Sequence, residues 1–309
     1  MDAWYCPLFE LPLPDGHAFP MVKYRQLYEA VRDRASAWDI ALREPAPATD
    51  ADLLRVHCPD YIARMHSGRV DPAQMRRIGF PWSAAMVARS CLSIGATIAA
   101  LRSALAGDGV AVNLAGGTHH AAFDRGGGYC VFNDTVVAAR NAQAHGLLRK
   151  LLVIDLDAHH GNGTAELCAG DASVFTFSMH AAKAFPARKP PSDLDVPLAT
   201  GTNDADYLDA LARHLPDAIA RAGADAAIYR AGADPFVGDR LGGLGLTHAG
   251  LAERDRVVFA ACRRAGLPMA VTMAGGYAPD PDDIVAIHLR TVGLAAAAAS
   301  TPAIAGART

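Results

Sequence analysis

Short apolar runs alternate with longer helix-like stretches along most of this chain, and this alternation restricts its possible folds more than any other feature. The runs are rich in β-branched residues and are often bounded by Gly or Asp. They span Val110–Leu114, Leu151–Leu156, Val174–Ser178, Ala226–Tyr229 and Pro268–Met273. Continuous apolar runs of this length are typical of strands buried on both faces of a parallel sheet.

The segments between these runs have the length and periodicity of helices. They are Ala84–Ala106, Asp134–His145, Asp204–Ala222, Thr247–Ala265 and Pro281–Ala298. Strand and helix in alternation predict βαβ units with right-handed crossovers. We therefore expect one doubly wound α/β domain. The first ~80 residues are less regular: a Pro-rich entry precedes a helix-like stretch, Tyr24–Leu42.

Composition excludes several classes of protein. Hydrophobic residues make up 51% of the 309 and charged residues 20%, which excludes a disordered chain. The 29 basic and 32 acidic residues give a net charge of −3, so direct nucleic-acid binding is not expected. We expect neither a membrane-spanning run of ~20 apolar residues nor a signal peptide. The six scattered cysteines, with no CxxC pair, favour reduced thiols in a cytoplasmic protein.

Gly-rich or His-bearing turns follow the five predicted strands. They read AGGTHH (115–120), DAHHGNG (157–163), MH (179–180), RAGADP (230–235) and AGGY (274–277). Ligands of open parallel sheets bind beyond the carboxyl ends of the strands. One such turn would be weak evidence, but five of them predict one shared site.

Two of these turns carry residues with the chemistry of metal ligands. Asp157 and His159 are separated by one residue, a spacing that directs both side chains to one side at a strand end. Asp234 would complete a set of three, and three protein ligands with an open position are typical of catalytic zinc. A solvated turn explains an isolated Asp-x-His better than a metal site does, and Asp-Pro is a common turn pair.

The remaining candidates carry acid–base chemistry. His119 and His120 are adjacent, and Asp155 lies inside an apolar run, where a carboxylate is costly unless it is paired. A histidine N–H or a cation could pair with the Asp155 carboxylate, and pairing with histidine would fix the imidazole tautomer. Tyr277 either donates to a developing oxyanion or simply packs at the end of its strand.

Several motifs together resemble one known family. GGTHH, GGGYCVFND, DLDAHHGNG, AGADP and GGY occur in the order found in the zinc-dependent histone deacetylases. The segments HAFPMVKY, VHCPDYI, IGFPWS and FPARKPPSDLDVPL resemble its bacterial class IV-like members. The resemblance covers roughly residues 15–295. It implies the arginase/deacetylase fold, with about eight mainly parallel strands and helices on both faces, as a single catalytic domain over residues 1–309.

The resemblance also implies a role for each matching residue. The zinc ligands would be Asp157, His159 and Asp234. The catalytic groups would be His120 as general base and acid, His119 as its charge-stabilising neighbour and Tyr277 as oxyanion donor. Outside these groups, the implied positions are Asn162 beside His120, Asp155 and Ser178 at a structural potassium ion, Gly128, Tyr129 and Phe185 in the substrate tunnel, and Leu241 at its rim.

Some residues depart from the family pattern. Asn162 replaces a frequent Asp, as is usual in the class IV-like branch, and should leave His120 less basic. Thr118 replaces a large aromatic residue, which predicts a wider tunnel floor that could admit acyl groups longer than acetyl. Arg230 stands where an uncharged residue is usual, and could pair with a carboxylate or select an anionic ligand. Ala274, in a turn that is usually all glycine, could shift Tyr277.

Three functions are compatible with this sequence. The leading one is a zinc-dependent amidohydrolase that removes acyl groups from N-acyl-lysine side chains of proteins or peptides; iron(II) can replace zinc in such a site. The second is hydrolysis of small acylated amines such as acetylpolyamines, which the lack of a long insertion disfavours. The third is a degenerate, non-catalytic metal-binding module. The oligomeric state is left open.

Overall fold

Four adjacent strands form a sheet centre in which every residue is buried: β3 (Val110–Asn113), β8 (Met269–Thr272), β7 (Ala226–Arg230) and β4 (Leu151–Asp155). They belong to an eight-stranded sheet with the order β2-β1-β3-β8-β7-β4-β5-β6. All seven strand pairings are parallel. The expected α/β fold with a parallel sheet of about eight strands is confirmed.

This arrangement comes from a computed structural model that describes residues 1–107 and 109–299. Position 108 and the last ten positions of the predicted domain 1–309 lie outside the described residues. The remaining strands lie toward the two edges of the sheet: β1 (Asp2–Trp4), β2 (Ala41–Arg43), β5 (Val174–Ala181) and β6 (Leu194–Leu198).

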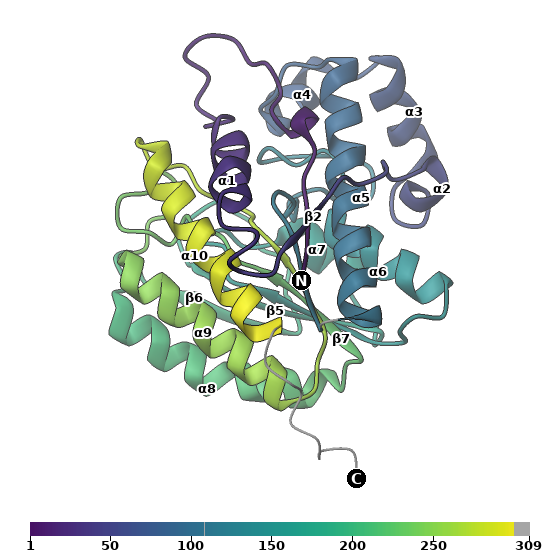
Figure 1. Cartoon of the computed structure of the whole chain (residues 1–309). Helices are drawn as coiled ribbons and strands as arrows, with labels where there is room; N and C mark the ends of the chain where they lie inside the picture. The colour runs from purple at the N-terminus through teal and green to yellow at the C-terminus, as the bar shows by residue number, and fades with distance from the viewer. Residues whose placement is uncertain (108, 300–309) are drawn as a thin grey trace.

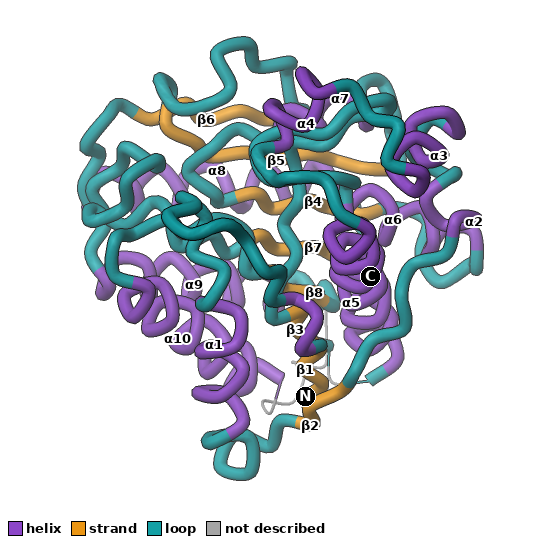
Figure 2. Tube along the Cα trace, turned by 90° about the horizontal axis from the view of Figure 1, so that it is seen from above, coloured by secondary structure: helices purple, strands orange, loops and turns teal. Residues whose placement is uncertain are grey.

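Helices cover both faces of the sheet. Figures 1 and 2 show α1, α8, α9 and α10 on one face and α5 with α6 and α7 on the other. The helix bounds are α1 (Lys23–Arg32), α2 (Asp50–Leu53), α3 (Pro59–Ser67), α4 (Pro72–Ile78), α5 (Ala84–Ala106), α6 (Asp134–Ala144), α7 (Asn162–Cys168), α8 (Asp204–Ala222), α9 (His248–Arg264) and α10 (Pro281–Ala299).

Side-chain caps determine where several of these helices begin. Ser83, Asn133, Asn203 and Thr247 each accept a hydrogen bond from a backbone N–H of the first helical turn, at the starts of α5, α6, α8 and α9. Such caps satisfy donors that the helix itself leaves unpaired. The predicted helical stretches therefore begin within about one residue of their observed positions.

Two sequence predictions about secondary structure were wrong in detail. The helix expected over Tyr24–Leu42 ends at Arg32, and its last part enters strand β2. Asp39 adopts a left-handed backbone (φ 50°), which a helix cannot contain. Strand β5 continues past Ser178 to Ala181, so His180 lies inside the strand and not in the following turn.

Helix α5 is the one described helix that is long and apolar enough to cross a membrane, with a mean hydropathy of 1.6. No continuous run of ~20 apolar residues was expected from the sequence, and α5 passes this test on its average hydropathy although it contains Arg89 and Arg102. Within the fold, 78% of the apolar window is buried, and α5 packs against β3, β8 and α6. Burial on several sides explains its apolar composition, because the core helix of a large domain passes the same test.

Candidate active site

The predicted site residues come together at the carboxyl ends of four adjacent strands. His119 and His120 follow β3, Asp157 and His159 follow β4, Asp234 follows β7, and Tyr277 follows β8. Because β3, β8, β7 and β4 are neighbours in the sheet, their ends open into one region. Segments separated by more than 100 residues in the sequence thus supply a single pocket.

Asp157, His159 and Asp234 present one potential ligand atom each, and these atoms lie within 4.8 Å of one another. His159 Nδ1 is 3.0 Å from Asp157 Oδ1 and 2.9 Å from Asp234 Oδ2. All three side chains are buried. Backbone N–H groups orient the carboxylates: Gly275 donates to Asp157, and Ala158 donates to Asp234.

The chemistry of this cluster fits a divalent cation. Burial and the adjacent Asp157 raise the pKa of Asp234 to about 8, because two buried carboxylates repel each other when both are ionised. A bound cation would hold both carboxylates in the charged form. Two oxygens and one imidazole nitrogen form a donor set that zinc accepts, with a position left for a further ligand. The backbone also fits closely, since a Cβ at Gly275 would lie 2.0 Å from Asp234 Oδ2.

His119 and His120 form a linked pair beside this cluster. His119 Nδ1 is 2.8 Å from Asp155 Oδ2, and His120 Nδ1 is 2.7 Å from Asn162 Oδ1. Both Nδ1 atoms therefore donate to oxygen. The two Nε2 atoms are 3.1 Å apart. The hydrogen bond from His119 explains how Asp155 is tolerated inside an apolar strand.

The environment of His120 keeps that ring neutral. Burial, followed by the nearby His119 and His159, holds the pKa of His120 well below its ordinary value. Asn162 provides a hydrogen-bond acceptor without a negative charge, so it compensates less than an aspartate would. A neutral imidazole at this position can accept a proton.

Tyr277 lies on a turn that three side chains hold in place. Lys23 Nζ, which is buried, donates to the carbonyl oxygen of Gly276 at 3.1 Å. The N–H of Tyr277 donates to Asp239 Oδ2 at 2.6 Å, and Arg240 Nε donates to the Tyr277 carbonyl oxygen at 3.0 Å. Burial, together with the carboxylates of the cluster, raises the pKa of the Tyr277 phenol well above its ordinary value, so it remains a hydrogen-bond donor.

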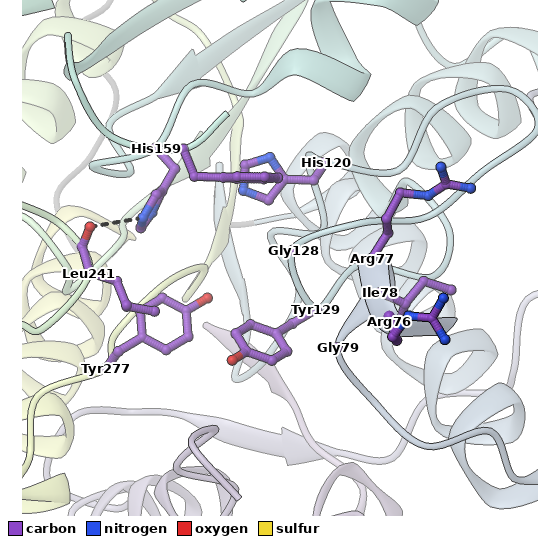
Figure 3. A pocket seen from close by; sticks show the side chains of 11 residues that line it. Arg76, Arg77, Ile78, Gly79, His120, Gly128, Tyr129, His159, Leu241 and Tyr277 are labelled. Atoms are coloured by element: carbon purple, nitrogen blue, oxygen red, sulfur yellow. Dashed lines mark hydrogen bonds between the residues drawn. The ribbon is translucent and has the colours of Figure 1, made fainter. Parts of the chain in front are cut away.

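A pocket of about 290 Å³ leads from the surface to these groups. Figure 3 shows His120, His159, Tyr129 and Tyr277 around its inner part. The predicted tunnel residues Gly128, Tyr129 and Phe185 and the rim residue Leu241 all line it. Phe185 and Leu241 are about half exposed, at 51% and 47%, as expected near an entrance. Gly128 is required here, because a Cβ at this residue would lie 2.4 Å from the His120 ring.

Thr118 does not widen this tunnel in the way its small size suggests. Its hydroxyl donates to Asp134 Oδ1 at 2.9 Å and accepts from the Asp134 N–H at 3.0 Å. Thr118 does not line the pocket but an adjoining inner cavity of only about 30 Å³, which shares His120, Gly128, Tyr129 and Tyr277 with it. Such a volume holds a group of the size of a methyl or a water, and not a long acyl chain.

Two further departures from the family pattern are accommodated by pairing and packing. Arg230 is fully buried, donates to Thr135 Oγ1 at 2.6 Å and lies 3.6 Å from Asp134 and 3.8 Å from Asp155. It thus pairs with carboxylates and is not among the residues that line the pocket. Ala274 adopts a left-handed backbone (φ 54°) and packs against Gly117. A Cβ added to Gly117 would lie 2.5 Å from the Cβ of Ala274.

Asp155 and Ser178 lie opposite each other in the β4–β5 register, as a shared ion site would require. Ser178 Oγ is 2.9 Å from His180 Nδ1. His180 also belongs to a second group of potential ligand atoms, with His160 and Asp195. Its members pair among themselves, since His160 Nε2 lies 3.3 Å from Asp195 Oδ1.

Some pocket residues were not predicted from the sequence. The C-terminal end of α4 provides Arg76, Arg77 and Ile78 to the wall, and Gly79 follows directly. Lys23 and Asp239, which hold the Tyr277 turn, were missed as well. Lys23 stands in the quoted segment HAFPMVKY, and its signal was an isolated lysine among apolar residues. Asp239 had no such signal.

The fold and the site together define a class: α/β proteins that gather carboxylate and histidine ligands at the carboxyl ends of a parallel sheet. The Histone deacetylase domain model matches residues 17–291. The chain belongs to the histone deacetylase family, whose members act on acylated amines.

Individual relatives agree with this assignment. The chain is 42% identical over 284 residues to an uncharacterised protein of Picosynechococcus sp., covering 92% of this chain and 94% of that one. It is 31% identical to a histone deacetylase-like amidohydrolase of Pseudomonas aeruginosa, over 86% of this chain and 74% of that one. It is 29% identical to histone deacetylase 2 of Arabidopsis thaliana, over 87% of this chain and 72% of that one. The crystal structure of the HDA15 HD domain has the same fold, with a TM-score of 0.80 at 21% identity, over 98% of this chain and 90% of that one.

Proposed function

We propose that this protein is a zinc-dependent deacetylase that removes acetyl and other short acyl groups from N-acyl-lysine side chains. The observation that supports this most is the position of His120, His159 and Tyr277 at the inner end of one tunnel-like pocket. Membership of the family supports hydrolysis of an acylated amine. The Asp157, His159 and Asp234 donor set supports zinc.

These three residues would hold the metal. When bound, it would polarise the amide carbonyl and lower the pKa of water at the site toward ~7. We also propose a structural potassium ion beside Asp155 and Ser178, which the register places opposite each other.

The chain's own residues supply the proton transfers. Neutral His120 accepts a proton from the attacking water. His119, held by Asp155 at 2.8 Å, lies next to His120 and stabilises the charge that develops during the reaction. Tyr277 donates a hydrogen bond to that oxygen. The protonated histidine then returns the proton to the leaving nitrogen as the carbon–nitrogen bond breaks, which releases a free amine and a carboxylate.

The shape of the pocket favours a lysine side chain carrying a short acyl group. Tyr129, Phe185 and Leu241 give apolar walls along which the methylene groups of lysine can pack. Beyond the catalytic groups, the cavity of about 30 Å³ leaves room for a methyl group. We therefore propose acetyl as the preferred acyl group, in place of the longer groups that Thr118 suggested.

An acyl-chain series tests this proposal. Acetyl-, butyryl- and octanoyl-lysine forms of one peptide are compared, using metal-free protein reconstituted with zinc or with iron(II). The acetyl form should have the highest kcat/KM, and His120→Ala should lower kcat by roughly 10²–10⁴-fold at unchanged metal content. Preference for octanoyl-lysine would contradict the acyl-length assignment. A higher kcat/KM for acetylspermidine would favour the small-amine alternative. Absence of turnover with either metal would overturn the enzymatic proposal.

A further inference from the structure

One side of the pocket mouth carries positive charge. Arg76 and Arg77 form the last turn of α4, are both exposed, and both line the pocket. Figure 3 places their guanidinium groups on the side of the pocket away from Leu241 and Tyr277. No Asp or Glu is among the residues that line this pocket. The mouth is therefore positive although the whole chain has a net charge of −3.

The position of Arg76 and Arg77 at the end of a helix explains only in part why two arginines are found at the pocket mouth. Basic residues in a last turn stabilise the negative end of the helix dipole. Some exposed arginines of this chain, such as Arg25 and Arg125, have a carboxylate within ion-pair distance, and others, such as Arg34 and Arg69, have none among the described residues. Among the described residues, Arg76 and Arg77 have no such carboxylate. Two adjacent guanidinium groups at a pocket entrance thus retain their capacity to bind an anion.

Further cations stand next to other residues of the mouth. Lys183 and Arg188 lie within three residues of Phe185, and Arg240 directly precedes Leu241; all three are exposed. Arg240 donates to the carbonyl oxygens of Tyr277 and Ala18, and Asp239 precedes it in the sequence, so Arg76 and Arg77 are the basic side chains that line the pocket itself. A peptide rich in lysine and arginine would be repelled.

We propose that Arg76 and Arg77 form an anion-binding subsite that takes the carboxylate of an Asp or Glu flanking the acylated lysine. This inference rests on the proposed deacylase function and assigns the class of its substrate: acyl-lysine in an acidic sequence context. A guanidinium group binds a carboxylate through two parallel hydrogen bonds, which gives orientation as well as attraction.

The depth of the pocket assigns the carboxylate to the flanking peptide and not to the acyl group. The acyl group must reach past His120 and His159 toward the cavity of about 30 Å³, which does not hold a dicarboxylic acyl chain. Arg76 and Arg77 are exposed whereas His120 and His159 are buried, so the arginines lie toward the mouth, where we place the peptide backbone of the substrate. They can therefore contact residues that precede or follow the lysine.

The test compares three acetyl-lysine peptides that differ only in flanking residues: Asp/Glu, Asn/Gln or Lys/Arg. We measure kcat/KM with zinc-loaded wild type, the double variant Arg76→Gln/Arg77→Gln, and the control Arg213→Gln, which changes an exposed arginine on α8. Wild type and control should prefer the acidic to the neutral peptide by about 3–20-fold, less so at high salt. In the double variant, kcat/KM for the acidic peptide should fall to about the value that the same variant shows for the neutral peptide.

Two outcomes would overturn the subsite. One is an unchanged preference in the double variant; the other is equal or faster processing of the basic peptide by wild type. Fluorescently labelled forms of the same peptides provide a binding measurement that needs no hydrolysis. If no peptide is hydrolysed but the acidic one binds more tightly in an Arg76- and Arg77-dependent way, the proposed function fails and the subsite stands. Succinyl-lysine hydrolysis that depends on the arginines would assign the carboxylate to the acyl group and contradict the placement.

Discussion

Replacing Asn162 by Asp is expected to make His120 more basic and to shift the acidic limb of the pH–rate profile to higher pH. The substitution changes one atom and places a negative charge where the amide oxygen now lies, 2.7 Å from His120 Nδ1. With charge centres about 4 Å apart and an effective dielectric constant of about 20, the attraction is about 4 kcal/mol, or about 3 pKa units. Burying the carboxylate offsets part of this, so we expect a rise of about 1–3 units.

The sign of the effect follows from the role of His120. A general base acts when it is neutral, so activity is lost as pH falls through its pKa. Burial and the neighbouring histidines hold the pKa of His120 low in the wild type, which therefore stays active at lower pH than the variant.

The assay is kcat/KM for an acetyl-lysine peptide across about pH 5–9, with metal content measured at each end of the range. Asn162→Ala is the control, because it removes the hydrogen bond without adding charge and should not move the limb upward. Superimposable acidic limbs for wild type and Asn162→Asp would refute the assignment of His120 as the base.

Three other predictions concern catalysis and stability. Tyr277→Phe should lower kcat by roughly 10²–10³-fold with metal content unchanged; a loss below tenfold would remove Tyr277 from oxyanion binding. His57 accepts the Asn133 N–H at Nε2, and burial lowers the pKa of His57 to about 4. As the pH falls from ~6.5 to ~4, the unfolded chain binds a proton at His57 and the folded chain does not. The free energy of unfolding should therefore decrease by about 3 kcal/mol over this interval. His57→Gln should flatten the pH dependence of the melting temperature, and an equal slope in both proteins would contradict this. Arg230→Met leaves two buried carboxylates without their cation and should cost about 3–5 kcal/mol of unfolding free energy; an unchanged denaturant midpoint would show that the pairing contributes nothing.

The sequence predicted the centre of the fold well because the central strands are buried on both faces. An apolar run such as Leu151–Leu156 carries its burial in its composition, and β4 is found at Leu151–Asp155. The strands at and next to the edges of the sheet lack this signal. Strands β1 and β2 have three residues each, and β6 contains Pro197, which an edge strand tolerates.

For the site, residues at strand ends were predictable because sheet topology brings them together. Asp157, His159 and Asp234 each follow a recognisable strand. Side-chain direction was not predictable, as Thr118 shows: a small residue suggested open space, but its hydroxyl is engaged with Asp134 and the adjoining cavity is small. Arg76 and Arg77 were missed because their helix lies outside the sheet, where no strand-end rule applies.

The most direct test of the central claim is a crystal structure of the zinc-loaded protein with anomalous diffraction recorded on both sides of the zinc absorption edge. The account predicts one anomalous peak within about 2.0–2.3 Å of atoms from Asp157, His159 and Asp234, with His120 and Tyr277 facing its open side. A peak bound by other residues, or no zinc peak among these three side chains in protein saturated with zinc, would contradict it.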